Sequence, residues 1–134
     1  MSLIDKLKKL SNDAISEKAE YEGKIIEDVT SYFKNIFESK EFYDELKDAC
    51  SSPKSLIEKK YTTLVEVSTK AYSLHTYFTI FHYEFNCEKT LSEDLRKDIL
   101  ISIRDMFIKQ LLNLGFRVNT IMDSFYKYRI EISW

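Results

Sequence analysis

The chain has 134 residues, the length of one domain, and its 44% apolar and 31% charged residues are typical of a globular protein with a packed core. It carries 20 basic and 22 acidic side chains, whereas a protein that binds nucleic acid through its phosphates normally has a basic excess. With only two glycines and one proline, the chain is predicted to form long regular elements joined by short polar turns.

The first part of the chain has a helical pattern. From Leu3 to Ile36 the positions on one face of the predicted helix, most of them apolar, recur at intervals of four, three and four residues. This gives an eleven-residue period close to that of a straight α-helix. Ser2, three residues before Asp5, is a suitable start. The segment Ser11-Asn12-Asp13 either lies within one long helix or ends a first helix and caps a second, and we favour the break.

A second helical region follows directly. Ser39 is a suitable N-cap for KEFYDELKDAC, and Ser51-Ser52-Pro53 ends that helix. One more helical turn is expected just after the proline. We therefore predict that residues 2–50 are helical.

The middle of the chain changes to a strand pattern. Residues 60–68 alternate, with Tyr61, Thr63, Val65 and Val67 on one side, and we predict a strand there. Residues 74–86 fit either a strand or a helix, and their Thr, Tyr, Phe and Ile content favours a strand.

The last third predicts a helix and then a hairpin. Thr90 with Glu93 matches a capping box, and Gly115 follows the end of a helix over residues 91–114. Two alternating runs then flank Asp123-Ser124, which predicts a C-terminal hairpin over residues 116–134. In its second strand one face is apolar, made by Tyr126, Tyr128, Ile130, Ile132 and Trp134.

This order of elements predicts an α+β fold in one domain, residues 1–134. The N-terminal helices and the helix at 91–114 should pack on one face of a small antiparallel sheet of about four strands, with strands near 60–68 and 74–86 and in the hairpin.

No catalytic or cofactor motif is present in the sequence. It has no phosphate-binding glycine loop and no nucleophile elbow, so we expect no cofactor and no enzymatic activity. His82, Glu84 and Cys87 lie near one another in the sequence and are the best candidates for a metal site or a thiol enzyme, but they match no known ligand spacing. The preferred interpretation is that they have a structural role.

No apolar run approaches the roughly 20 residues of a membrane span, and no secretory signal precedes the first helix. Two cysteines without close pairing suit a reducing compartment. We therefore expect a cytoplasmic protein, of a bacterial or infected host cell, that does not bind membranes.

The amphipathic first helix and exposed aromatic residues favour a binding role. The partner is expected to be another protein, or a second copy in a homodimer. The candidate interface residues share an aromatic or β-branched side chain on the first helix or the central strands: Tyr21, Ile25, Val29, Tyr32, Tyr77 and Tyr83. A second hypothesis is nucleic-acid binding by bases stacked on Tyr77, Phe81, Tyr83 and Tyr128, which is not favoured because no RNP-like motif supports it.

The segment "LLNLGFRVN…YKYRIEISW", residues 111–134, resembles the C-termini of small uncharacterised proteins of tailed bacteriophages. The resemblance rests on a helix ending in Leu-Gly-Phe, a hairpin and an Ile-Ser-Trp end, and it carries over no functional residue. It implies a phage or bacterial accessory protein, either a virion or assembly component or an inhibitor of a host factor.

Overall fold

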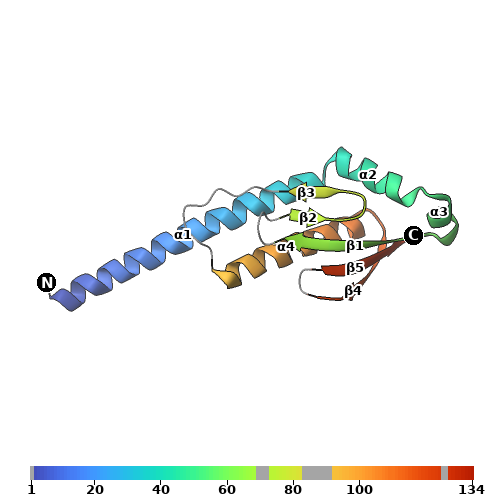
Figure 1. Cartoon of the computed structure of the whole chain (residues 1–134). Helices are drawn as coiled ribbons and strands as arrows, with labels where there is room; N and C mark the ends of the chain where they lie inside the picture. Colours follow the sequence, from blue (N-terminus) through green and yellow to red (C-terminus); the bar gives the residue numbers. More distant parts are fainter. Residues whose placement is uncertain (1, 69–72, 83–91, 125–126) are drawn as a thin grey trace.

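The computed structural model describes residues 2–68, 73–82, 92–124 and 127–134. In these residues helices cover one face of an antiparallel sheet, which confirms the predicted α+β class (Figure 1). The elements along the chain are α1 Leu3–Phe37, α2 Lys40–Cys50, α3 Pro53–Glu58, β1 Lys60–Ser68, β2 Ser73–His75, β3 Ile80–His82, α4 Glu93–Asn113, β4 Arg117–Met122 and β5 Lys127–Ser133.

The sheet has five strands in the order β3-β2-β1-β5-β4, and every neighbouring pair is antiparallel. The C-terminal strand β5 is therefore an inner strand between β1 and β4. As predicted, its side chains alternate, and Tyr128, Ile130 and Ile132 are buried. Trp134 lies at the rim and packs edge-on against Phe116, with ring centroids 6.0 Å apart.

The prediction of one strand over residues 74–86 is wrong, because a tight turn divides its described part into β2 and β3. The Thr76 hydroxyl accepts hydrogen bonds from the N–H groups of Phe78 and Thr79 at 3.3 and 3.0 Å. The backbone N–H of Thr76 also donates to the carbonyl of Thr79 at 2.8 Å. A threonine thus makes the turn that glycine, asparagine or proline usually marks, and the sheet gains a fifth strand.

The expected break at Ser11-Asn12-Asp13 is also wrong, because α1 is one helix of 35 residues, about 52 Å long. These three side chains are exposed, and each costs only about 0.7 kcal/mol or less relative to alanine in a helix. No proline interrupts the segment, so the helix continues through it.

The predicted caps of α1 and α2 are confirmed. Ser2 Oγ accepts from the Asp5 N–H at 3.1 Å, and Ser39 Oγ accepts from the Phe42 N–H at 3.2 Å. The N-cap of α4 is Ser92, whose Oγ accepts from the Leu95 N–H at 3.3 Å, so the predicted start of this helix was two residues too early; the predicted cap Thr90 itself lies outside the described residues. Ser92 precedes two carboxylates in the first turn of α4, where the positive end of the helix dipole favours them.

The end of α4 follows the prediction. Gly115 has a φ of 95°, a conformation that glycine adopts without steric cost. Its N–H donates to the Leu112 carbonyl at 3.0 Å, and the Phe116 N–H donates to the Leu111 carbonyl at 3.2 Å. These two bonds form a Schellman motif, which turns the chain from α4 into β4.

The core lies between the sheet and the second half of α1, α2 and α4. Four phenylalanines from these three helices are in contact, with ring centroids between 5.5 and 6.0 Å apart: Phe33, Phe37, Phe42 and Phe107. All four are buried, so they contribute large apolar area to the stability of the domain.

Candidate functional site

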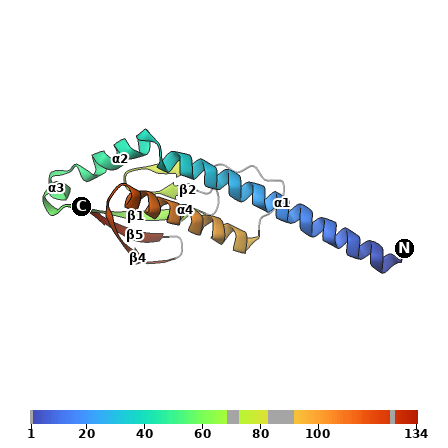
Figure 2. The ribbon, with the colours of Figure 1, turned by 180° about the vertical axis from the view of Figure 1, so that it is seen from behind.

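The first half of α1 extends away from the rest of the molecule. Figures 1 and 2 show it passing beyond α4 and the sheet, so that the N-terminus lies far from the C-terminus. Every residue from 2 to 20 is exposed. This segment, about 29 Å long, has no packing partner among the described residues.

Five large aliphatic side chains are exposed on this segment. They recur on one side of the helix, and we call them the α1 stripe: Leu3, Ile4, Leu7, Leu10 and Ile15, with exposed fractions of 71, 64, 52, 63 and 67%. An isolated helix of this length is only marginally stable in water, and burial of each such side chain would contribute about 1.5–3 kcal/mol. The stripe is therefore suited to packing against an apolar face of another helix.

Charge is unevenly distributed along the same segment. Residues 2–10 contain three lysines and one aspartate, whereas residues 11–22 contain four acidic residues and one lysine. That lysine, Lys18, forms an ion pair with Glu22 at 3.9 Å. The exposed half of α1 thus has a basic beginning and an acidic continuation.

The interface candidates on α1 lie mainly in the other half of the helix. Ile25 and Val29 are 4% and 1% exposed, so they belong to the core and are not available to a partner. They were placed on an interface because their spacing continues that of the stripe. Tyr21 and Tyr32 are partly buried and pack against the core.

The aromatic candidates on the central strands have different positions. Tyr77 is 72% exposed in the turn between β2 and β3, where its N–H donates to Thr63 Oγ1 at 3.2 Å. Tyr83 lies outside the described residues, as does the side chain of Phe81. Tyr128 is fully buried and cannot stack on a base, which removes one of the four aromatic residues from the nucleic-acid hypothesis.

Arg104 of α4 lies over the buried ring of Tyr128, with its guanidinium carbon 5.8 Å from the ring centroid. Burial raises the pKa of the Tyr128 phenol, while the nearby arginine opposes that shift. The phenol oxygen has no hydrogen-bond partner among the described residues. Burial therefore suppresses the ionisation of Tyr128, which acts as a core residue.

The structure does not test the metal site predicted from the sequence. The side chain of His82 and all of Glu84 and Cys87 lie outside the described residues. Within the described part of the chain, no group of three His, Cys, Asp or Glu side chains is arranged to hold a metal ion.

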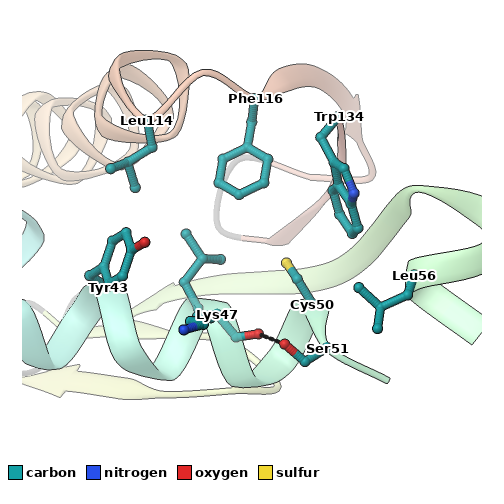
Figure 3. Close-up of a pocket in the computed structure, with 9 residues that line it drawn as sticks. Tyr43, Lys47, Cys50, Ser51, Leu56, Leu114, Phe116 and Trp134 are labelled. Atoms are coloured by element: carbon teal, nitrogen blue, oxygen red, sulfur yellow. Dashed lines mark hydrogen bonds between the residues drawn. The ribbon is translucent and has the colours of Figure 1, made fainter. Parts of the chain in front are cut away.

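An apolar pocket of about 290 Å³ lies at the other end of the molecule, where α2, α3 and the end of α4 meet the C-terminus (Figure 3). Its lining comes from segments distant in the sequence: Tyr43, Leu46, Lys47, Cys50, Ser51, Leu56, Leu114, Phe116 and Trp134. The Cys50 sulfur is directed toward the rings of Phe116 and Trp134. The walls are therefore mainly aromatic and aliphatic.

Cys50 is one of the titratable residues that line this pocket. Burial raises the pKa of its thiol to about 11, so it is neutral at physiological pH. Because the thiolate is the nucleophilic form of cysteine, Cys50 is suited to packing rather than to covalent catalysis.

The sequence predicted an interface on the first helix but assigned it to residues 21–32 rather than to the α1 stripe, and it did not predict the pocket. The stripe follows the same period as the core positions of α1, and periodicity alone does not show where the covering layer ends. A usable signal was the charge distribution, since residues 2–22 combine an apolar stripe with segregated lysines and glutamates. The pocket brings together residues from 43 to 134, and no local pattern predicts that assembly.

In the described residues, no helix has both the length and the apolar character needed to cross a membrane. Comparisons with protein-family models, curated proteins and solved structures found no match for the chain.

Proposed function

We propose that this protein acts by binding a protein partner through the α1 stripe, either a different protein or a second copy of the chain, without catalysing a reaction. The observation that carries the proposal is the exposure of five aliphatic side chains on one side of an extended helix. Amphipathic helices commonly bind by placing such a face into an apolar groove or against another helix. An exposed apolar stripe of this length indicates an interaction surface.

The charges beside the stripe would set the specificity of binding. Lys6, Lys8 and Lys9 are near its beginning, and Glu17 and Glu20 are near its end. A partner with the opposite order of charges would be steered to the correct register, whereas a partner with the same order of charges would be repelled. Such a role fits an assembly component or an inhibitor of a host factor in a phage or bacterium.

The test is capture of a partner by the full chain in the cells where it occurs. Leu7→Glu with Leu10→Glu places two charges on the stripe. Asn12→Glu with Ser16→Glu adds the same charge to the opposite side of the helix, where both residues are exposed. We expect a stoichiometric partner, either a different protein or an untagged second copy of the chain, to co-purify with the original chain and with the control, and to be lost from the stripe variant.

Binding that survives the stripe substitutions, or that is lost equally in both variants, would contradict the proposal. Circular dichroism of the two variants must show equal helix content, because otherwise a loss of binding could arise from unfolding of α1.

A further inference from the structure

We infer that the partner of the α1 stripe is the same stripe on a second copy of this chain, with the two helices antiparallel over residues 3–21. The inference rests on the proposed function, since it uses the same surface and names its occupant. Its support comes from the arrangement of apolar and charged residues along the exposed half of α1.

The positions with four-three-four spacing, which include Leu3, Leu7 and Leu10 of the α1 stripe, match themselves in reverse order. Leu3, Leu10, Ala14 and Tyr21 lie on one side of the helix, and Tyr21, which is partly buried, marks the point where that side reaches the core of its own chain. When two copies are antiparallel, Leu3 lies opposite Tyr21 and Leu10 lies opposite Ala14. A large side chain thus faces a small one near the two-fold axis, and the pattern repeats symmetrically on both sides.

Lys18 interrupts the apolar stripe at the level of Leu7 in this arrangement. Its alkyl stem can cover Leu7 of the second copy while its ammonium stays with Glu22 of its own helix, the pair already present at 3.9 Å. The lysine therefore does not leave a buried unpaired charge.

The flanking charges select the antiparallel orientation. Lys6 and Glu17 are eleven residues apart, three helical turns, and so lie on the same flank of the stripe. Antiparallel helices bring a flank against the same flank of the other copy, which places Lys6 beside Glu17 twice by symmetry. A parallel pair would instead bring the lysine-rich turns of the two copies together, where they repel.

The shape of the molecule also permits this orientation. Residues 2–20 extend beyond α4 and the sheet, and the stripe enters the core of its own chain from Ile25 onward. An antiparallel overlap of residues 3–21 puts the body of each copy beyond the N-terminus of the other. The two bodies then lie at opposite ends of the helix pair and do not compete for space.

The first experiment is a sedimentation-equilibrium concentration series on the purified full-length chain. We expect a monomer–dimer equilibrium that Leu7→Glu with Leu10→Glu abolishes and Asn12→Glu with Ser16→Glu leaves in place. A chain that is monomeric throughout the series overturns the inference, as does a dimer that the stripe substitutions do not weaken.

Charge exchange then tests the orientation. Lys6→Glu alone and Glu17→Lys alone should each weaken the dimer by about tenfold, because each breaks two symmetric ion pairs and creates like-charge contacts. The double variant should return to within about threefold of the original affinity, since it restores both pairs in reversed sense. Additive weakening in the double variant overturns the antiparallel register.

Zero-length carbodiimide crosslinking provides an independent check. Lys6 and Glu17 are about 16 Å apart along one helix, too far for an amide bond within a chain. A crosslinked Lys6–Glu17 peptide therefore identifies the antiparallel pair, and a Lys6 crosslink only to acidic residues near its own level contradicts it.

These results separate the inference from the proposed function. If the purified chain is monomeric but a different protein still co-purifies in a stripe-dependent way, the inference fails and the proposed function stands. If neither self-association nor partner capture depends on the stripe, both fail.

Discussion

The two halves of α1 have one sequence pattern and opposite surroundings. In the second half Ile25, Val29, Phe33 and Phe37 are between 0 and 4% exposed, whereas the stripe side chains of the first half are at least 52% exposed. The four-three-four spacing that begins at Leu3 continues through Ile25 and Val29 to Ile36, and Phe33 and Phe37 lie directly beside it. The pattern therefore specifies which side of the helix is apolar, but not what covers that side.

The difference arises from the lengths of the elements that meet. α4 has 21 residues and is about 31 Å long, while α1 has 35 residues and is about 52 Å long. The longest strand of the sheet, β1, has nine residues and is about 30 Å long, close to the length of α4. The elements that pack on α1 therefore end before α1 does, and they leave its first half uncovered (Figure 2).

The largest expected difference in stability is between a short C-terminal deletion and a longer N-terminal deletion. Deletion of residues 130–134 removes four of the seven residues of β5, an inner strand with Ile130 and Ile132 buried at 0 and 1% exposure. We expect this variant to be unfolded. Deletion of residues 2–20 removes a longer segment, yet it should leave a folded domain, because that segment makes no core contact among the described residues.

Dispersion of amide proton signals in NMR spectra and cooperative urea unfolding measure both outcomes. A folded protein after the short C-terminal deletion would contradict the role of β5 as an inner strand of the core. An unfolded protein after the long N-terminal deletion would contradict the division of α1 into a covered and an uncovered half.

Replacing a large apolar side chain by alanine should have unequal effects in the two halves of α1. Phe33→Ala removes a fully buried ring from the phenylalanine cluster and should lower the free energy of unfolding by about 3–5 kcal/mol. Leu7→Ala should change the unfolding free energy of the monomer by about 0.5 kcal/mol or less, because Leu7 is 52% exposed.

Urea denaturation at a protein concentration below that of self-association gives both values. If Leu7→Ala destabilises the monomer by as much as Phe33→Ala does, the first half of α1 must have a partner within its own chain.

The local signals in the sequence predicted much of the fold. The serine caps of α1 and α2, the glycine after α4 and the alternation of β1 and β5 all depend on residues within a few positions of one another. Such signals are physically local, since a cap is a hydrogen bond between residues three apart and a strand face repeats every second residue.

The features that were missed depend on distant contacts or on unusual residues. Thr76 makes a turn without glycine or proline, so residues 74–86 were predicted as one strand. Ile25 and Val29 were assigned to an interface because the sequence does not show where α4 and the sheet stop covering α1. The candidate site was missed for the same reason. Its apolar side chains can be read from the sequence, but their exposure depends on the relative lengths of α1 and α4.

The smallest expected effect on stability comes from removing the serine cap at the start of a helix, and it should differ between α2 and α1. Ser39→Ala removes a cap inside the domain, where Ser39 Oγ accepts from the Phe42 N–H at 3.2 Å and donates to the Ile36 carbonyl at 2.6 Å. It should lower the free energy of global unfolding by about 1 kcal/mol. Ser2→Ala removes a similar cap at the uncovered end of α1, where fraying does not disturb the core, so the free energy of global unfolding should be almost unchanged.

Faster hydrogen exchange at Asp5 and Lys6 should be the main effect of Ser2→Ala, because these N–H groups belong to the first turn of the helix. Equal losses of global stability from the two substitutions would show that the beginning of α1 unfolds together with the core, and the two halves of the helix would then be one cooperative unit.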